Sequence, residues 1–499
     1  NVPESLCFSI YKHSYETSRL TWVLKYNSKN ILRRWVLMKI TLAFPHTLES
    51  ERLGARSFPP TAIYYLGAIL RNNGHAVRVF DPQWPNNYDD NFIRDAIDGC
   101  DLLGLSANVI NWRFAKHFAS LVKSQRKDLK IVIGGVYANI VKVLDIDNPP
   151  WDFIIRGEGE ETLIELVNSI DGSCRYDNIL GLSYIDESGV IHNNADRPLL
   201  TKKELSNQPL PAFDLLPNKK YLALGLESSR GCSYNCKFCS IQYRNKFRSI
   251  AQQIFLDKIA AVYDLGHEKV NTPNHNKVPI MLLDDCFTTE QQRAINILKG
   301  LAKYKEKIRF GIEARADQLS EEIAEALKEN SLFIIQIGME SGYQDGLNKI
   351  GKHLKIEDIK KACAVLKKND LAKIASCSFI LGFPWETKDD CLKTLRFAED
   401  LNLKYEVNVG LSWYELYPGS VIWEKKAKWK INVDLQSYND FFYDFRNDIN
   451  FFKKVHPILN TKDIDEIEDH VFEISKVSTR VLTNFPYMQR ERNICSLPF

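Results

Sequence analysis

The stretch Arg230-Gly231-Cys232-Ser233-Tyr234-Asn235-Cys236-Lys237-Phe238-Cys239-Ser240 places three cysteines within eight residues. Thiolates are the soft ligands that iron–sulfur clusters require, and a fully protein-ligated four-iron cluster takes four of them. No fourth cysteine stands nearby, because the next ones along the chain are Cys174 and Cys286. The spacing therefore predicts a 4Fe-4S cluster on three thiolates, with one iron left open for a substrate or cofactor.

Two other interpretations of the three cysteines are open. Zinc sites also use closely spaced cysteines, but they normally pair one Cys-x-x-Cys with a second pair of ligands. No Cys-x-x-Cys or His-x-x-x-His partner occurs elsewhere in the sequence. Cysteines that merely pack as small apolar residues would not favour one polar loop flanked by glycine. We therefore expect Cys232, Cys236 and Cys239 to hold the cluster.

This Cys-x-x-x-Cys-x-x-Cys loop, with Phe238 directly before the third cysteine, resembles the signature of the radical S-adenosylmethionine (SAM) superfamily. The resemblance implies that the open iron chelates SAM and that SAM cleavage yields a 5'-deoxyadenosyl radical. It also implies a small-molecule substrate and an external reductant protein such as flavodoxin or ferredoxin.

Composition narrows the class of protein. A chain of 499 residues is too long for one core and predicts about two to four domains. Lys plus Arg number 66 against 63 Asp plus Glu, without a long basic run alternating with aromatics, so nucleic acid is not indicated as a partner. Eleven scattered cysteines favour reduced thiols and hence a cytoplasmic location. No apolar run reaches the roughly 18 to 20 residues of a membrane helix.

Residues 1–37 carry charges and aromatics without a clear period and lack the apolar core of a signal peptide. The first convincing strand, residues 39–44, follows directly on Met38. We therefore expect either that Met38 is the functional start or that residues 1–37 form an appendage with no chemical part.

Residues 38–170 alternate short apolar runs with amphipathic stretches, the pattern of a parallel sheet wrapped by helices. Strands are predicted at 39–44, 76–80, 101–106, 130–134 and 152–155, and helices at Thr61–Asn73, Trp112–Arg126 and Gly159–Ile170. Five strands with crossovers make a doubly wound, Rossmann-like (flavodoxin-like) α/β domain. In such a domain ligands lie at the carboxyl ends of the strands, near the topological switch point.

Small or polar residues follow those strand ends, and glycine there lets a backbone approach a bulky ligand closely. They are Ser106, Gly134-Gly135 and Gly157-Glu158-Gly159-Glu160. With Pro59-Pro60, Leu66, Leu70 and Gly74-His75, these segments resemble the cobalamin-binding domain that precedes many radical SAM domains. The resemblance implies cobalamin contacts from Ser106, Gly134, Gly135, Gly157 and Glu158.

Three points about this domain stay open. No histidine stands in the Asp-x-His-x-x-Gly motif with which some cobalamin proteins replace the lower base, so the lower face of the cobalt is unassigned. A nicotinamide-binding domain would need Gly-x-Gly-x-x-Gly in the first strand-to-helix turn, which offers only Gly54. A domain that binds nothing, or only a protein partner, is the other alternative.

Residues 171–221 are expected to form a linker. Leu182–Ile185 and Val190–His192 flank a turn-forming Asp186-Glu187-Ser188-Gly189 and predict a hairpin. In the resembling family, such a linker positions one cofactor over the other.

The alternation resumes over residues 222–430, with strands predicted at 222–227, 280–284, 308–313, 333–338, 375–381 and 407–412. Six repeats predict the partial (β/α)6 barrel of radical SAM enzymes, and barrel active sites gather at the carboxyl ends of strands. Polar residues follow those ends, namely Asp284-Asp285, Glu313, Arg315, Gly338-Met339-Glu340-Ser341-Gly342 and Gly382-Phe383-Pro384-Trp385-Glu386-Thr387.

The resemblance also implies where SAM binds. Glu340 lies in the segment that supplies a carboxylate to the SAM ribose hydroxyls in the family, and such hydrogen bonds suit a carboxylate. The Arg315 guanidinium has the shape to meet the SAM carboxylate, with an ion pair to Glu313 or Asp317 as the alternative. The expected SAM contacts are Phe238, Gly338, Glu340, Ser341 and Arg315.

Residues 431–499 are expected to form a mainly helical extension that covers the open side of the barrel, with a helical run from Asp463 to Leu482. The expected function is cobalamin-dependent radical SAM methyl transfer to an unactivated carbon of a small metabolite or natural product. Relatives with the same architecture use cobalamin for cyclisation or ring rearrangement without methylation. A non-enzymatic cobalamin- or cluster-binding sensor is the alternative from a different class.

Overall fold

The computed structural model describes residues 37–46, 58–82, 84–85, 87–140, 149–170, 175–218, 221–270, 277–435, 449–477 and 482–483. All of these lie in one compact unit, Leu37–Phe499. Residues 1–36 of the expected appendage lie outside the described residues, and so does Gly54. The eight cysteines in the described part of the chain form no disulfide with one another.

The first sheet has the strand order β2-β1-β3-β4-β5-β6-β7. Its parallel strands are β1 (Lys39–Ala43), β2 (Ala76–Phe80), β3 (Leu102–Ser106), β4 (Lys130–Gly134) and β5 (Phe153–Ile155). The order 2-1-3-4-5 is that of a flavodoxin-like doubly wound sheet, with its switch point between β1 and β3. The predicted fold of this region is confirmed.

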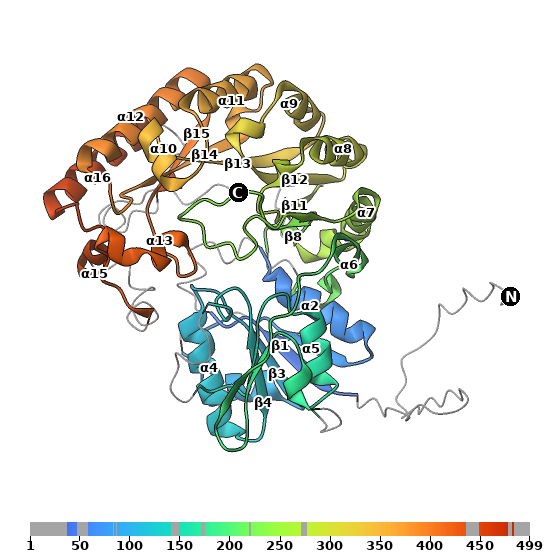
Figure 1. Ribbon diagram of the computed structural model, residues 1–499. Helices are drawn as coiled ribbons and strands as arrows, with labels where there is room; N and C mark the ends of the chain where they lie inside the picture. Colours follow the sequence, from blue (N-terminus) through green and yellow to red (C-terminus); the bar gives the residue numbers. More distant parts are fainter. Residues whose placement is uncertain are drawn as a thin grey trace. The chain divides into compact units, whose positions relative to one another are not determined.

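Four helices flank this sheet in two pairs. They are α2 (Thr61–Asn72), α3 (Asp90–Ile97), α4 (Trp112–Gln125) and α5 (Glu160–Val167). Helix α2 packs against α5 and α3 packs against α4, which puts one pair on each face of the sheet (Figure 1). Sequence periodicity predicted α2, α4 and α5 but not α3.

The predicted hairpin forms, but it belongs to the first sheet. Strands β6 (Leu182–Ile185) and β7 (Ile191–Asn193) run antiparallel, and β6 pairs with β5. Leu182 and Ser183 are fully buried there. The hairpin therefore extends the sheet to seven strands, whereas the sequence indicated only a connector.

The second sheet is parallel throughout, in the order β16-β15-β14-β13-β12-β11-β8. Its strands are β8 (Leu224–Leu226), β11 (Val278–Leu282), β12 (Ile308–Ala314), β13 (Leu332–Glu340), β14 (Ala375–Leu381), β15 (Asn408–Trp413) and β16 (Leu482–Thr483). All six predicted strands are confirmed. The edge strands β8 and β16 are not paired with each other, so the described part of the barrel is open.

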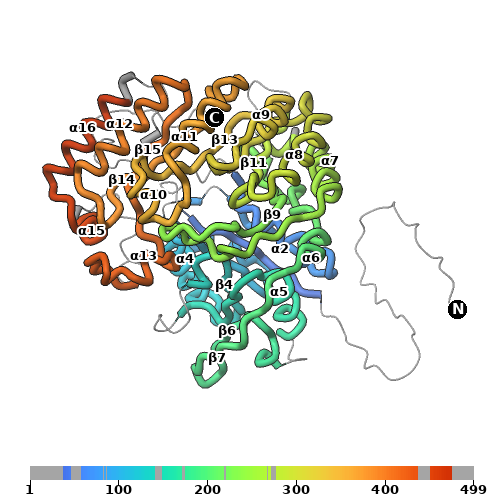
Figure 2. Tube along the Cα trace, turned by 45° about the horizontal axis from the view of Figure 1, so that its top comes forward, coloured from blue at the N-terminus to red at the C-terminus, as the bar shows by residue number. Residues whose placement is uncertain are grey.

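Helices lie along the outer side of this sheet (Figures 1 and 2). They include α7 (Gln252–Lys269), α8 (Gln291–Leu301), α9 (Glu321–Lys328), α11 (Ile356–Lys368) and α12 (Lys388–Tyr405). Alternate strand residues face opposite sides. In β14, Cys377 and Phe379 are fully buried, whereas Ser376 is half-buried and Ser378 is exposed. One face of the sheet is thus covered by helices, and the inner face is open.

Five further α-helices belong to the described part of the unit. They are α6 (Lys202–Asn207), α10 (Gln344–Ile350), α13 (Val421–Glu424), α15 (Ile449–Val455) and α16 (Thr461–Val477). Helix α16 packs against α12. The predicted helical run is wrong at its end, because Leu482 lies in β16, opposite Gly410 of β15. In the described residues, no helix combines the length and the apolar character that crossing a membrane requires.

Candidate functional site

The three cysteines lie on a loop closed by two short antiparallel strands, β9 (Ser229–Arg230) and β10 (Arg248–Ser249). Within the loop, the Cys232 backbone amide donates to the Tyr243 carbonyl over 3.3 Å, and that of Cys239 donates to the Cys236 carbonyl over 3.2 Å. The loop follows β8 directly and therefore stands at the carboxyl end of the second sheet. This is the position that the sequence predicted.

The three thiols form a group, because Cys236 lies within electrostatic range of both Cys232 and Cys239. Burial raises the pKa of the Cys232 thiol to about 11 and that of the Cys239 thiol to about 12. Burial thus favours the protonated thiols. A coordinated metal reverses this preference, because it deprotonates its thiol ligands.

Hydrogen bonds tie the cysteine loop to the barrel. The Arg244 guanidinium donates to the Cys239 carbonyl over 2.8 Å and to the Gly419 carbonyl over 2.9 Å. The Lys237 backbone amide donates to the Ile350 carbonyl at the end of α10 over 2.9 Å. The Ile241 amide donates to Cys239 Sγ over 3.4 Å, the kind of bond to sulfur that tunes a cluster.

Glu340 ends β13 with a left-handed backbone, φ +70°. Its Oε1 accepts a hydrogen bond from Lys352 Nζ over 2.9 Å, and both side chains are buried. A Cβ at Gly338 would collide with this pair, so a side chain there would displace the Glu340 carboxylate and the Lys352 ammonium group. Ser341 is fully buried, and its hydroxyl faces Gly346 of α10.

The Arg315 guanidinium is committed to protein partners. It holds both carboxylate oxygens of Asp317, at 3.1 and 3.2 Å, and donates to the Lys352 carbonyl over 2.7 Å. It also lies 3.5 Å from the centre of the Tyr234 ring in the cysteine loop. Of the two arrangements that the sequence left open, the structure contains the ion pair with Asp317.

Phe238 belongs to an aromatic wall beside the cysteine loop. Its ring lies 5.9 Å from that of Phe383, which stacks on Trp385 at 5.3 Å. The Glu386 carboxylate shapes this segment, because it accepts bonds from the Gly382 and Phe383 amides over 2.8 and 3.0 Å. The rings of Phe238, Phe383 and Trp385 thus form an apolar surface beside the cysteine loop.

Two aspartates follow β11. The Asp284 carboxylate accepts bonds from the Ser228 and Ser229 amides over 2.6 and 3.0 Å, so it fixes the approach to the cysteine loop. The Asp285 carboxylate accepts a bond from the Gly231 amide over 2.9 Å, and burial raises its pKa to about 6.

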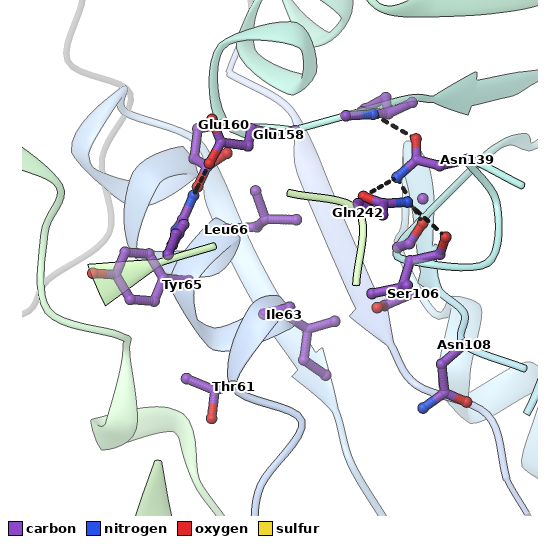
Figure 3. A pocket seen from close by; sticks show the side chains of 18 of the residues that line it. Thr61, Ile63, Tyr65, Leu66, Ser106, Asn108, Asn139, Glu158, Glu160 and Gln242 are labelled. Atoms are coloured by element: carbon purple, nitrogen blue, oxygen red, sulfur yellow. Dashed lines mark hydrogen bonds and ion pairs between the residues drawn. The ribbon is translucent and has the colours of Figure 1, made fainter. Parts of the chain in front are cut away.

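A cavity of about 670 Å³ lies between the carboxyl ends of the first sheet and the cysteine loop. Figure 3 shows it from close by. All five residues that were expected to contact cobalamin line it, namely Ser106, Gly134, Gly135, Gly157 and Glu158. Gln242 and Tyr243 line it from the cysteine loop. The structure therefore brings the expected cobalamin residues and the segment that follows the last cysteine of the loop to one cavity, whereas none of the three cysteines and none of the expected SAM contacts lines it.

Two glycines shape the cavity wall. Gly135 has φ +102°, and a Cβ there would collide with the Ala107 backbone. Gly157 has φ +77°, and a Cβ there would project into open space. Gly157 thus leaves the wall open towards a large ligand such as a corrin ring, whereas Gly135 lets the chain pack closely on the Ala107 backbone. None of the described residues that line the cavity is a histidine.

Ion pairs join one side of the cavity to the cysteine loop. The Glu158 carboxylate lies 3.1 Å from Arg230 and 2.8 Å from Arg248, and it accepts a bond from the Leu200 amide over 2.7 Å. Arg230 also pairs with Glu160, over 2.6 Å. The Glu158 side chain is buried. Glu158 therefore links β9 and β10, the two strands that close the cysteine loop, to the first sheet.

Amide hydrogen bonds join the other side of the cavity to the loop (Figure 3). Asn139 Nδ2 donates to Gln242 Oε1 over 2.9 Å, and Gln242 Nε2 donates to the Val136 carbonyl over 2.8 Å. The sequence did not predict this pair. Asn139 lies four residues after Gly135 of the expected cobalamin contacts, but nothing local marks Gln242.

Comparison with known proteins agrees with this geometry. The radical SAM superfamily model matches residues 226–398, and the B12 binding domain model matches residues 55–167. The chain is 30% identical over 401 residues to "Uncharacterized methyltransferase PH0819" of Pyrococcus horikoshii, covering 78% of this chain and 83% of that protein. It is 24% identical over 420 residues to the anaerobic magnesium-protoporphyrin IX monomethyl ester cyclase of Rubrivivax gelatinosus, covering 81% and 72%.

Solved structures share the fold. The cobalamin-dependent S-adenosylmethionine radical enzyme OxsB, with aqua-cobalamin and S-adenosylmethionine bound, has a TM-score of 0.65 at 20% identity, covering 88% of this chain and 71% of that one. The radical S-adenosylmethionine methyltransferase TsrM from Kitasatospora setae has a TM-score of 0.62 at 15% identity, covering 80% and 76%. From the family matches, the chain belongs to the radical SAM superfamily, as an enzyme with a B12-binding domain whose cofactors are a 4Fe-4S cluster, SAM and cobalamin.

Proposed function

We propose that this enzyme transfers a methyl group to an unactivated carbon of a small metabolite or natural product. The observation that carries the proposal is the cavity of about 670 Å³ that adjoins both the predicted cobalamin residues and the cysteine loop. When bound, the cluster with SAM supplies a radical that abstracts hydrogen, and cobalamin supplies a transferable methyl group. Methyl transfer needs the two to act within one site.

The residues of the chain have separate roles in this proposal. Cys232, Cys236 and Cys239 hold the cluster, and the glycine-rich strand ends of the first sheet hold cobalamin. The aromatic wall of Phe238, Phe383 and Trp385 excludes water from the radical, which would otherwise be quenched. A reductant protein such as flavodoxin or ferredoxin supplies the electron.

A second candidate is cyclisation without methylation. The relative from Rubrivivax gelatinosus carries the name of a cyclase, and it aligns with 81% of this chain. Both reactions use the same two cofactor regions, so the products decide between them.

The test uses the full chain, purified without oxygen and reconstituted with iron, sulfide and hydroxocobalamin. One cluster and one cobalamin per chain are expected. After SAM and reductant are added, 5'-deoxyadenosine and S-adenosylhomocysteine should both form, because methyl transfer consumes SAM in two ways. Replacement of Cys232, Cys236 or Cys239 by serine should abolish the formation of 5'-deoxyadenosine. Formation of 5'-deoxyadenosine by an enzyme that retains no cobalamin would refute the methyltransferase proposal.

A further inference from the structure

Lysines gather in the segment of residues 421–430, which forms α13 and a short 3-10 helix, Lys426–Trp429. The segment holds one acidic residue, Glu424, against four lysines, namely Lys425, Lys426, Lys428 and Lys430. The whole chain has a net charge of only +3. The segment is therefore a local concentration of positive charge.

The charges of these four lysines are not compensated. Three of them are exposed, and Lys426 is half-buried. None of the four forms an ion pair within the part of the chain that the structure describes. Lys426 Nζ lies 4.4 Å from the centre of the Trp423 ring, and Lys428 Nζ lies 4.9 Å from that of Trp429. These contacts orient the side chains without neutralising them, because an aromatic ring carries no net charge.

Hydrogen bonds tie this segment to the cysteine loop. The Ile422 backbone amide donates to the Lys237 carbonyl over 3.1 Å. Arg244 bridges the carbonyls of Cys239 and Gly419, two residues before the segment begins. In both views α13 lies close to α10 and to the cysteine loop (Figures 1 and 2). The lysines therefore begin directly beside the loop that carries the cluster ligands.

The cysteine loop itself reaches the surface at this place. Cys236 is buried, but its two neighbours in the chain, Asn235 and Lys237, are exposed. Lys237 Nζ donates to the Lys349 carbonyl at the end of α10 over 2.7 Å, which fixes a fifth cation here. An iron held by Cys236 is thus one residue away from the surface. We call Lys237, Lys425, Lys426, Lys428 and Lys430 the lysine patch.

The lysine patch has the chemistry of a docking site for an acidic protein. A positive surface attracts an acidic partner, speeds the encounter and fixes its orientation. A nucleic acid would also be attracted to lysines, but it has no use for a cluster ligand that lies just beneath the surface. An electron donor does, because its redox centre must come close to the cluster. The position of the patch therefore favours an electron-transfer protein.

We propose that the lysine patch is the docking site of an acidic electron-transfer protein such as a ferredoxin. One electron passes from the reduced partner to the oxidised cluster, and no bond forms or breaks in this step. The inference rests on the proposed function, since it gives a place to the reductant named there. It does not depend on whether the product is methylated or cyclised.

The first test measures binding without electron transfer. Oxidised ferredoxin of strongly negative net charge is titrated into the reconstituted holoenzyme by calorimetry, at low and at high ionic strength. Salt should weaken the complex, because it screens exposed charges. The double variant Lys425→Glu/Lys428→Glu reverses two exposed charges and should raise the Kd at low salt by at least about tenfold. An unchanged Kd in the folded double variant would overturn the proposal.

The matched control is the double variant Lys299→Glu/Lys303→Glu. It changes the net charge by the same amount, at two exposed positions on α8 and the turn after it. In both views α8 and α13 lie on opposite sides of the barrel (Figures 1 and 2). The control should bind ferredoxin within about threefold of the wild type. Equal losses in the two double variants would show that net charge alone drives binding, and would overturn the proposal.

The second test follows 5'-deoxyadenosine formation with two electron donors. With ferredoxin, Lys425→Glu/Lys428→Glu should raise the KM for ferredoxin by at least about tenfold and leave kcat nearly unchanged. With reduced methyl viologen, a small cation that needs no docking surface, the variant should be no slower than the wild type. Loss of rate with both donors would mean that the substitutions damage the cluster, and would overturn the docking role. Because no methylated product is measured, failure of the methyltransferase proposal would leave these results intact.

Two further measurements complete the test. The single variants Lys425→Gln and Lys428→Gln remove one charge each and should raise the Kd for ferredoxin about threefold, which covers the case that the double variant does not fold. Total tRNA serves as a competing polyanion. If the double variant lost tRNA binding but kept ferredoxin binding, the patch would be a nucleic-acid surface, and the proposal would be overturned.

Discussion

At the scale of single residues, Glu340 is held in a backbone conformation that residues other than glycine rarely adopt. Its φ is +70° at the point where the pairing of β13 with β14 shifts register. A non-glycine residue in this region costs on the order of 1–3 kcal/mol. The buried ion pair with Lys352 and the absence of a side chain at Gly338 together make room for it.

Gly338→Ala should therefore break the Glu340–Lys352 pair. Uncoupling a buried ion pair costs about 3–5 kcal/mol, so we expect a loss of at least about 2 kcal/mol in the free energy of unfolding, measured with urea. Gly410→Ala is the matched control on the same inner face, because the nearest atom to its Cβ would lie at 3.8 Å. Equal losses in the two variants would contradict this account.

Residue roles were predictable where the signal is local. The three cysteines are recognisable from their spacing alone, and the structure places them on one loop at the carboxyl end of the second sheet. Arg315 could not be assigned from sequence, because Glu313 and Asp317 are both two residues away and Tyr234 on a distant loop orients its guanidinium. The bond between Asn139 and Gln242 joins residues 103 positions apart, and no local pattern encodes it.

At the scale of elements, prediction failed where tertiary contacts decide the structure. Helix α3 is short, although Asp89 caps it by accepting a bond from the Phe92 amide over 2.8 Å. Its Phe92 is packed among aromatic rings that include Trp84 and Phe118, which come from elsewhere in the sequence. The two-residue strand β16 exists only through its pairing with β15. A strand of two residues has no period of its own, whereas α3 is as long as α5, which the sequence did predict, so its length alone does not explain why it was missed.

Helix α16 provides a pH-dependent prediction. Glu468 is buried and accepts a bond from Trp413 Nε1 over 3.1 Å, and burial raises its pKa to about 7. A carboxyl whose pKa is higher in the folded than in the unfolded state favours folding while it is protonated. This stabilisation is lost as the pH rises from the ordinary pKa of a glutamate towards 7. Glu468→Gln should thus raise the Tm at pH 8 and have little effect near pH 4.5, as measured by calorimetry.

Its control lies two residues earlier on the same helix. Glu466 is half-buried and pairs with Lys388 over 2.6 Å, and that bond lowers the pKa of Glu466. A carboxyl with a lowered pKa stabilises the fold at pH values above its ordinary pKa, so the expected change in Tm has the opposite sign. Glu466→Gln should lower the Tm slightly at pH 8. A rise in Tm for both variants would show that removal of charge from α16, rather than burial of Glu468, is the cause.

At the scale of the whole molecule, the cavity is bounded by two sets of bonds that link the first sheet to the cysteine loop. Glu158 reaches both strands that close this loop, through Arg230 in β9 and Arg248 in β10. Asn139 reaches Gln242, three residues after the last cysteine. The wall of the predicted cobalamin site is therefore also a support of the predicted cluster site.

Glu158→Gln should loosen both sites together. Arg230 keeps its bonds to Glu227 and Glu160, but Arg248 loses its only ion-pair partner in the described part of the chain. We expect the free energy of unfolding to fall by about 3 kcal/mol, with lower iron and lower cobalamin content after reconstitution. Glu161→Gln, whose carboxylate is half-exposed and pairs with Arg197, should cost no more than about 1 kcal/mol and retain both cofactors. If Glu158→Gln lost cobalamin but kept full iron content and stability, Glu158 would act as a cobalamin contact alone, and the two sites would not be mechanically coupled through it.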